Sequence, residues 1–242
     1  EDLQHGSSLR EWCAEVELFP LSRNGARMRA ASSLLTPGTP FTHAYFRSPE
    51  LAERVEALQS EAPPDLVFAY TAAMGPFAER CGPAVGSCID LVDVDSVKWE
   101  HYARSKPVPL GWIFGIESRR LRRYERSIAR RFDTVLVTTD RERQTLRELS
   151  PGIDPIAVRN GVDTDYFSYA SRAEASDPRI VFTGQMDYYP NEDAVLSFAD
   201  AALPELRDRF PDLGFDVVGR APGVRLRKLG ANPGIHVTGE VP

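Results

Sequence analysis

The sequence predicts an α/β protein in which parallel sheets are covered by helices. Two observations support this fold class. Short, nearly continuous apolar runs alternate with amphipathic segments through most of the 242 residues, which is the pattern of buried parallel strands joined by helices. The alternation is interrupted by a small, polar stretch at residues 168–178, which is typical of a linker, and then starts again. We therefore expect two domains, residues 1–168 and residues 169–242.

Local patterns predict the elements of the first domain. Ala14–Phe19 alternates polar and apolar residues, as a half-buried strand does. Ser48–Gln59 is typical of a helix, because Ser48 suits the N-cap and Pro49 the first helical position. Continuous apolar runs predict strands at Asp65–Tyr70 and Ala84–Ile89. Further along, we expect a long helix, a strand, a capped helix and a short strand at Gly111–Arg131, Thr134–Val137, Thr139–Leu149 and Pro155–Val158.

The second domain repeats the same alternation. Strands are expected at Arg179–Thr183, Phe215–Val218 and Gly234–Thr238, a helix at Asn191–Ala202, and a short helix between the last two strands. Both domains are thus Rossmann-like, and ligands of such sheets bind where the strands end. The residues that directly follow each strand are the candidates for a site.

Composition excludes several classes of protein. With 42% hydrophobic and 26% charged residues, the chain is globular rather than disordered, and its net charge of −6 gives no general attraction for nucleic acid. The three cysteines match no zinc-binding spacing and favour a reducing, cytoplasmic setting. No run approaches a membrane span, and we expect no signal peptide. Because the chain begins without Met and stops directly after a predicted strand, we expect both ends to be cut.

Two loops after strands of the second domain suit a phosphate group. Gly184 follows one strand and allows close approach to the backbone, and the helix expected near Asn191 offers free N–H groups. Gly219-Arg220 follows the next strand, and an arginine fork can bind two phosphate oxygens. Ordinary turns with a solvated arginine explain the same residues. The nicotinamide and P-loop fingerprints are both missing.

Asp90, Asp93 and Asp95 follow a strand of the first domain. Asp93-Val94-Asp95 matches the D-x-D pattern of metal-dependent sugar transferases, but Asp163-Thr164-Asp165 matches it equally. Asp93 or Asp95 also suits the N-cap of the next helix. We therefore expect no metal site.

The segment Ile116–Arg131 carries seven arginines and two glutamates, and it has two explanations. A basic amphipathic helix docks on anionic lipid. A solvated face with Ile116, Leu121, Tyr124 and Ile128 turned inward explains it as well. Contact between Arg119–Arg131 and the inner face of a membrane thus remains open.

Three segments together resemble glycosyltransferase family 4. They are Asp90–Trp99, Val158–Asp163 and Phe182–Asn191, and Leu34–Phe46 and Val237–Pro242 fit the same group. Within that family they are most similar to the sugar transferases found with exopolysaccharide and PEP-CTERM (exosortase) gene clusters. The resemblance covers essentially the whole chain, and the segments occur in the family's order.

The resemblance implies a GT-B fold, in which two Rossmann-like, doubly wound domains face each other across a cleft, the second being incomplete here. The first is the acceptor side, and the second binds a nucleotide sugar as substrate. No metal or other cofactor is implied, and Asn160–Asp163 lies where the chain crosses between the domains. Asp90 and Asp93 are implied as cleft-facing catalytic side chains. The implied donor-binding residues are Gly184, Gln185, Asp187 and Asn191 near the phosphates, Gly219 and Arg220 beside them, and Val237, Thr238 and Gly239 in the pocket for the nucleobase.

The implied function is transfer of a sugar, with retention, to a polysaccharide or lipid-linked acceptor in cytoplasmic exopolysaccharide biosynthesis. The chain departs from the family in three ways. The glycine-rich loop near the start and the Glu-x7-Glu motif after the last strand are missing, and Gln185 and Asn191 stand where many members have Arg and Lys. We therefore expect the fragment itself to be inactive. A nucleotide-sugar epimerase of the same fold and a non-catalytic binding module stay open as alternatives, and a GT-A enzyme rests only on the D-x-D pattern.

Overall fold

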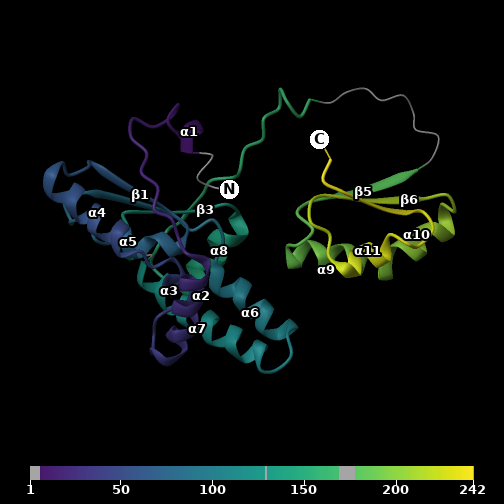
Figure 1. The fold of residues 1–242 in the computed structure, drawn as a ribbon, viewed down its shortest axis with the longest axis horizontal. Helices are drawn as coiled ribbons and strands as arrows, with labels where there is room; N and C mark the ends of the chain where they lie inside the picture. Colours follow the sequence, from purple (N-terminus) through teal and green to yellow (C-terminus); the bar gives the residue numbers. More distant parts are fainter. Residues whose placement is uncertain (1–5, 129, 169–177, 242) are drawn as a thin grey trace. The chain divides into compact units, whose positions relative to one another are not determined.

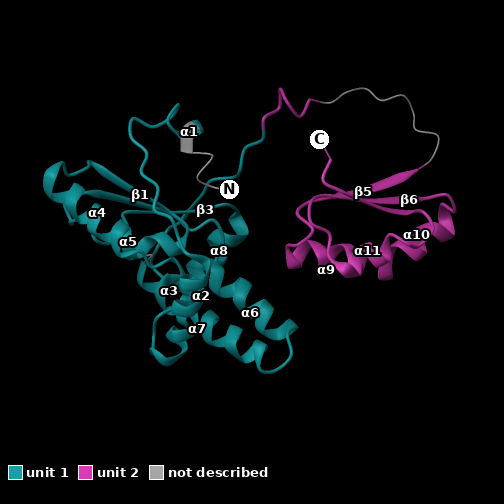
Figure 2. Cartoon of the chain, viewed as in Figure 1, with its two compact units in different colours: residues 1–162 teal, residues 163–242 magenta. Residues whose placement is uncertain are grey.

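The computed structural model describes residues 6–128, 130–168 and 178–241. It divides into two compact units, residues 1–162 and residues 163–242 (Figure 2). This division falls inside the Asn160–Asp163 segment. Residues 169–177, which make up most of the predicted linker, lie outside the described residues.

The sheet of unit 1 has the strand order β1-β2-β3-β4, and all its neighbours are parallel (Figure 1). The strands are β1 (Leu66–Tyr70), β2 (Gly86–Asp90), β3 (Thr134–Val137) and β4 (Ile156–Ala157). All four occur where apolar runs predicted them. Because the strands are parallel, their carboxyl ends meet at one edge, where Tyr70 pairs with Asp90 and Asp90 with Leu136.

Half of the described helical elements of unit 1 precede the first strand, and the other half lie between the strands. They are α1 (Gly6–Leu9), α2 (Arg23–Ser32), η2 (Ser33–Leu35), α3 (Phe41–Phe46), α4 (Pro49–Glu61), η3 (Ala72–Met74), α5 (Gly75–Ala78), α6 (Asp95–Ser105), α7 (Leu110–Ile128) and α8 (Asp140–Leu149). The predicted caps of α4 and α8 are confirmed, since the Ser48 hydroxyl accepts from the Leu51 N–H at 3.2 Å and Thr139 from Glu142 at 3.1 Å.

The core of unit 1 lies on one face of its sheet. Its members include strand residues and residues of the helices that cover them, namely Ala69, Ala78, Ile89, Ile128, Val135, Val137 and Leu146. The alternate residues of β1 point the other way, and Leu66, Phe68 and Tyr70 are 59%, 54% and 59% exposed. This edge strand thus presents apolar side chains on the face opposite the core.

The predicted strand at Ala14–Phe19 is wrong, because these residues are irregular. A strand needs a neighbouring strand to satisfy its backbone groups, and no strand of the described chain pairs with this segment. Its alternating acidic residues instead face a basic side chain of α4. Glu15 and Glu17 lie within ion-pair distance of Arg54 on α4, at 3.8 and 2.7 Å.

Unit 2 is a smaller sheet of three parallel strands in the order β5-β6-β7. The strands are β5 (Arg179–Thr183), β6 (Gly214–Val218) and β7 (Ile235–Gly239), and the helices are α9 (Tyr189–Ser197), η4 (Phe198–Ala202), α10 (Leu203–Arg209) and α11 (Val224–Leu229). Within this unit the labelled helices lie on one side of the sheet (Figure 1). Phe215 and Val217 pack there with Val195, Leu203 and Leu226 to form the core.

The helix predicted at Asn191–Ala202 extends at both ends. It begins at Tyr189, because Pro190 suits the first turn, and it continues as a wider π-helical stretch, η4, into α10. Pro204 has no backbone N–H to give, and a proline within a helical pattern usually predicts a stop. The chain instead passes this proline at the start of α10.

Candidate functional site

The loops after the three strands of unit 2 are joined by backbone hydrogen bonds. The Gly184 N–H donates to the Val218 carbonyl at 3.1 Å, and the Gly219 N–H donates to the Gly239 carbonyl at 2.9 Å. The Met186 N–H donates to the Arg220 carbonyl at 3.0 Å. Three of the predicted donor residues, Gly184, Gly219 and Gly239, are therefore held together at one edge of the sheet. We call residues 184–191, 219–223 and 238–239 the unit 2 rim.

Glycine is required at position 219 by close contact with the neighbouring loop. A Cβ at Gly219 would lie 1.6 Å from the Gly184 carbonyl oxygen, far inside any allowed contact. Its φ of +153° is also in the range that side chains rarely adopt. The two loops can therefore lie side by side only because residue 219 carries no side chain.

Polar groups of the rim point at one another and at solvent. The Arg220 guanidinium donates to the Gln185 side-chain oxygen at 3.2 Å, and the Asn191 amide donates to the Gln185 carbonyl at 3.0 Å. Arg220 and Gln185 are both exposed. Among the residues that the structure describes, the backbone N–H groups of Gln185, Asp187 and Arg220 donate to no acceptor. The rim thus combines one cation with several free donors.

The remaining predicted donor residues differ in what they can offer. Asp187 is exposed, and within the described chain its carboxylate makes no hydrogen bond or ion pair. Thr238 is exposed, and its hydroxyl donates to the Gly239 carbonyl at 2.9 Å. Val237 packs against the core of unit 2. Its side chain therefore contributes to stability, and its backbone is what lies beside the rim.

In unit 1, Asp90 and Asp93 flank a strained turn at the carboxyl end of β2. Val92 has a φ of +63°, and the Asp93 N–H donates to the Leu91 carbonyl at 2.7 Å, which closes a three-residue turn. The Asp90 carboxylate accepts from the Val92 N–H at 2.8 Å. Asp93 is exposed, so the turn presents its carboxylate at the edge of the sheet.

A second strained residue lies directly beside this turn. Thr71, which follows β1, has a φ of +73°, and its N–H donates to the Asp90 carbonyl at 2.8 Å. β-branched residues such as Thr71 and Val92 rarely adopt positive φ, and each such conformation costs on the order of 1–3 kcal/mol. Thr138 holds the strained Val92 in place, since its N–H and hydroxyl donate to the Val92 carbonyl at 3.0 and 2.8 Å. Strain of this kind concentrates at functional sites.

The helix after this turn is not capped by Asp93 or Asp95, so that interpretation is wrong. The N-cap of α6 is Val94, and carboxylates from two other helices accept from its first N–H groups. Glu142 accepts from the Val94 N–H at 2.7 Å, and Glu125 accepts from the Ser96 N–H at 2.9 Å. Burial raises the pKa of Glu125 to about 7, although the hydrogen bonds from Ser96 act in the opposite direction.

In neither D-x-D match do the two aspartates face a shared metal position. Asp95 pairs with Lys98 at 2.5 Å, and Asp163 accepts from the N–H groups of Asp165 and Tyr166 at 3.0 Å. Within residues 6–128, 130–168 and 178–241, no three His, Cys, Asp or Glu side chains lie close enough to hold a metal ion. In the same residues, no helix is both long enough and apolar enough to cross a membrane.

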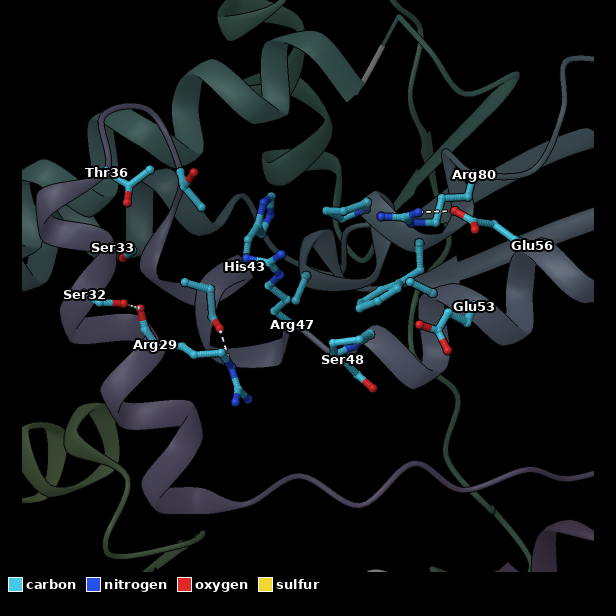
Figure 3. A pocket seen from close by; sticks show the side chains of 17 residues that line it. Arg29, Ser32, Ser33, Thr36, His43, Arg47, Ser48, Glu53, Glu56 and Arg80 are labelled. Atoms are coloured by element: carbon cyan, nitrogen blue, oxygen red, sulfur yellow. Dashed lines mark hydrogen bonds and ion pairs between the residues drawn. The ribbon is translucent and has the colours of Figure 1, made fainter.

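Unit 1 also contains a pocket of about 610 Å³ that sequence patterns did not predict (Figure 3). It is lined by residues of α2, η2, α3, α4, η3 and α5 and of the segments beside them, and neither Asp90 nor Asp93 is among them. Arg80 and Glu56 form an ion pair at one end of the pocket, and Arg29 lies at the other (Figure 3). The size is that of a typical small-molecule site.

The pocket mixes cations, carboxylates and hydroxyl groups. Arg29 donates to the carbonyls of Ala44 and Tyr45 at 3.3 Å, so its guanidinium is partly occupied. Arg47 and Glu53 make no hydrogen bond or ion pair with any other described residue and are available to a ligand. Burial lowers the pKa of His43 to about 4, so this imidazole is neutral near pH 7.

The arginines of α7 divide into structural and exposed groups. Arg120 is buried and donates to the carbonyls of Ser33 and Thr39 at 2.8 Å, and Arg122 pairs with Glu100 at 2.5 Å. Arg119 and Arg123 are exposed and form no ion pair within the part of the chain that the structure describes. The predicted inward stripe is confirmed for Leu121 and Ile128, which are fully buried.

The buried carboxylates Glu117 and Glu125 were missed. Glu117 accepts from the N–H groups of Phe41 and Thr42 at 2.6 and 2.9 Å and so caps α3. The signal was present in the spacing, since Glu117, Leu121, Glu125 and Ile128 recur at helical intervals on one face. The position of a glutamate within an apolar stripe indicates that it is turned inward.

Comparison with known proteins supports this description. Residues 6–161 match the Glycosyl transferase 4-like domain. The solved structure of TarM is 12% identical with a TM-score of 0.56, and the match covers 79% of this chain and 36% of TarM. Sucrose-phosphate synthase from Thermosynechococcus elongatus is 16% identical with a TM-score of 0.56, and the match covers 80% of this chain and 49% of that one. No curated protein sequence matches the chain.

The chain thus spans about a third to a half of the length of these two structures. Their similarity confirms the predicted α/β fold of the GT-B type, with Rossmann-like parallel sheets. The domain match covers most of unit 1 and well over half of the chain. The protein is therefore a member of glycosyltransferase family 4, with a glycosyl transferase 4-like domain at residues 6–161.

Proposed function

We propose that this chain forms the catalytic region of a glycosyltransferase that takes a sugar from a nucleotide-sugar donor. The observation that carries the proposal is the unit 2 rim. Two glycine-containing loops and the glycine that ends β7 meet there at the carboxyl ends of parallel strands, which is where such sheets bind nucleotides. Domain membership adds the class of reaction.

The rim suits a diphosphate better than a neutral ligand. Free N–H groups and the Arg220 guanidinium offer donors to phosphate oxygens, and Gly184 and Gly219 leave the backbone accessible. Asp187 repels phosphate and is better suited to accept from sugar hydroxyl groups. We assign Gln185 and Asn191 to orienting this loop, because the Gln185 side chain accepts from Arg220 and the Asn191 side chain donates to the Gln185 carbonyl.

Binding of nucleoside diphosphates tests the donor site. Titration calorimetry with UDP, GDP, ADP and TDP should find one that binds, and Arg220→Ala should weaken it. Arg225→Ala on α11 is the matched control, because Arg225 is also exposed and its replacement also removes one positive charge. Equal affinity of the Arg220 and Arg225 variants would place the phosphates elsewhere.

Arg220 should also matter more in the transition state than in the ground state. The charge on the diphosphate grows as the glycosidic bond breaks, so a fixed cation stabilises that state most. In the active protein, Arg220→Ala should lower kcat by raising the activation barrier by roughly 2–4 kcal/mol, and it should have a smaller effect on the donor KM. Arg220→Lys should recover only part of the loss, since a point charge replaces a fork.

Asp90 and Asp93 are proposed as the carboxylates nearest the reacting sugar. Asp93 has the freedom to act on a substrate, because it is exposed at the end of a strained turn, whereas Asp90 is engaged by the Val92 N–H. Asp93→Asn should therefore reduce kcat more than Asp163→Asn, which alters only a turn. A smaller effect of Asp93→Asn than of Asp163→Asn would show that Asp93 does not act on the substrate.

We propose that the acceptor enters the pocket of unit 1. Arg47 and Glu53 are available there, and they can bind phosphate and hydroxyl groups, respectively. Such groups occur together in a lipid-linked or polysaccharide acceptor. Arg47→Gln should raise the acceptor KM without changing nucleotide affinity, and a change in nucleotide affinity instead would contradict this assignment.

The remaining features of the reaction follow from the family resemblance. We propose retention of configuration, a role in exopolysaccharide biosynthesis on the cytoplasmic side, and catalysis without a metal ion. Activity should therefore survive excess EDTA, and rescue by manganese after loss would contradict this. An epimerase of the same fold is the second candidate, and it would turn over its nucleotide sugar without any added acceptor.

A further inference from the structure

The helices α6 and α7 form a hairpin whose turn is held rigidly. A Cβ at Gly111 would lie 2.5 Å from the Lys106 carbonyl oxygen and 2.7 Å from that of Ala103, so α7 starts in direct contact with the end of α6. Inside the hairpin, the Phe114 ring packs against Trp99 and Tyr102, with centroids 5.1 and 6.2 Å apart. The turn is therefore a fixed protrusion of defined composition.

That turn exposes large apolar side chains. Val108, Leu110 and Trp112 are 86%, 42% and 65% exposed, and they lie within five consecutive residues. Single exposed apolar residues are ordinary, but a group that includes tryptophan is typical of a surface that contacts an apolar partner. Tryptophan in particular favours the interface between water and lipid.

The outward face of α7 continues from this turn as a row of arginines. Trp112, Arg119, Arg123 and Arg126 recur at intervals of seven, four and three residues, which places them on one face of a helix. All four are exposed. Arg126 donates to the Leu149 carbonyl at 2.8 Å, whereas Arg119 and Arg123 have no partner among the described side chains.

No carboxylate of α7 offsets these charges at the surface. The helix contains two acidic residues, Glu117 and Glu125, which are 0% and 1% exposed. Both are turned inward and cap α3 and α6. The two acidic residues of α6 are already paired, Asp95 with Lys98 and Glu100 with Arg104 and Arg122. The outward face is therefore cationic beside an apolar turn.

We propose that this hairpin docks on an anionic lipid bilayer, with Val108, Leu110 and Trp112 inserted among the headgroups and Arg119 and Arg123 above the lipid phosphates. Charge complementarity argues for this partner, since the surface joins an apolar tip to uncompensated cations. The apolar face of α7 is already buried in the protein core. The helix therefore does not lie in the membrane by its own apolar face, and the turn is the part that inserts. This proposal does not depend on donor binding.

Vesicle sedimentation tests the proposal. The purified protein should pellet with vesicles of phosphatidylcholine and phosphatidylglycerol and should not pellet with phosphatidylcholine alone, and high salt should weaken binding. Arg119→Gln combined with Arg123→Gln should weaken binding about 30-fold, because each cation near the surface contributes about 1 kcal/mol. Trp112→Ser should weaken it about tenfold.

Matched controls keep the result specific to the hairpin. Arg225→Gln combined with Arg227→Gln removes the same charge from exposed positions in unit 2, and Trp12→Ser removes a tryptophan that is 88% exposed elsewhere. Both controls should bind as the wild type does, and circular dichroism verifies that every variant is folded. Equal loss in hairpin and control variants, or no binding to anionic vesicles, would overturn the proposal. Binding of the same residues to double-stranded DNA without binding to vesicles would overturn it as well.

Discussion

Glu125 and His43 should give unit 1 two opposing dependences on pH. Burial is the main cause for both: it raises the pKa of Glu125 from the usual 4.5 to about 7 and lowers that of His43 from 6.5 to about 4. Asp95 raises both pKa values, which adds to the effect of burial at Glu125 and opposes it at His43. Arg122 lowers the pKa of Glu125, and hydrogen bonds from Ser96 to Glu125 and from His43 to the Ala72 carbonyl partly offset the burial. Between about pH 4 and 7, both residues are therefore uncharged in folded unit 1, Glu125 because it keeps its proton and His43 because it has lost one.

The sign of each contribution follows from which state binds more protons. Between pH 4.5 and about 7, folded unit 1 holds a proton on Glu125 that the unfolded chain has lost, so stability falls as pH rises. Between about pH 4 and 6.5, the unfolded chain holds a proton on His43 that the folded unit lacks, so stability rises with pH. Each slope is about 1.4 kcal/mol per pH unit and each total is about 3 kcal/mol.

Because the slopes cancel, these two groups should leave the wild type nearly independent of pH between 4.5 and 6.5. Glu125→Gln removes the falling contribution, so the stability of that variant should rise by about 3 kcal/mol across this range. His43→Asn removes the rising contribution, so its stability should fall by about 3 kcal/mol between pH 4.5 and 7. The double variant should again be flat.

Urea unfolding followed by tryptophan fluorescence measures these slopes in unit 1 alone. All three tryptophans, Trp12, Trp99 and Trp112, lie in that unit. The free energy of unfolding is compared across pH for each variant, so a uniform loss of stability from the substitutions does not affect the result. Parallel pH profiles for the wild type and both single variants would show that the two groups titrate normally and refute the reasoning.

Three further predictions concern packing and capping. Gly219→Ala should destabilise unit 2 by at least about 3 kcal/mol, because the new Cβ meets a backbone carbonyl; hydrogen exchange of unit 2 measures this, with Gly161→Ala, which has open space, as control. Gly111→Ala should lower the urea midpoint of unit 1, since the new Cβ would lie 2.5 Å from the Lys106 carbonyl oxygen and 2.7 Å from that of Ala103; an unchanged midpoint would mean that the hairpin gives way. Glu117→Gln should cost about 1.5–3 kcal/mol in the same assay through weakened caps on α3, and a neutral result would mean that the amide replaces the carboxylate fully.

The strands and most helices could be predicted because their sequences carry strong local patterns. The runs before Tyr70, Ile89, Val137 and Thr183 are nearly continuous in apolar residues, and each became a strand. Ala14–Phe19 failed because an alternating pattern shows which residues can face a core but not whether a partner strand exists. Its acidic residues instead pair with Arg54, which lies far away in the sequence.

The polar interior could not be predicted from local patterns. The cap of α6 comes from Glu125 and Glu142, which are on other helices, so no residue near Val94 indicates it. The strained conformations of Thr71 and Val92 are likewise invisible, since both are poor residues for positive φ. The unit 1 pocket depends on six helical elements coming together. By contrast, Gly184, Gly219 and Arg220 could be selected from the sequence because they directly follow predicted strands, where ligands of such sheets bind. Their role in donor binding stays a prediction.

The most direct test of donor binding at the unit 2 rim is an amide chemical-shift titration with UDP, GDP, ADP and TDP. The account predicts that one of them saturably shifts the amides of Gly184, Gly219 and Gly239, and that Arg220→Ala weakens the effect. These glycines are ideal reporters, because their loops are joined by backbone hydrogen bonds at one edge of the sheet. Saturable shifts confined to unit 1, or no shift at the rim with any of the four nucleotides, would contradict it.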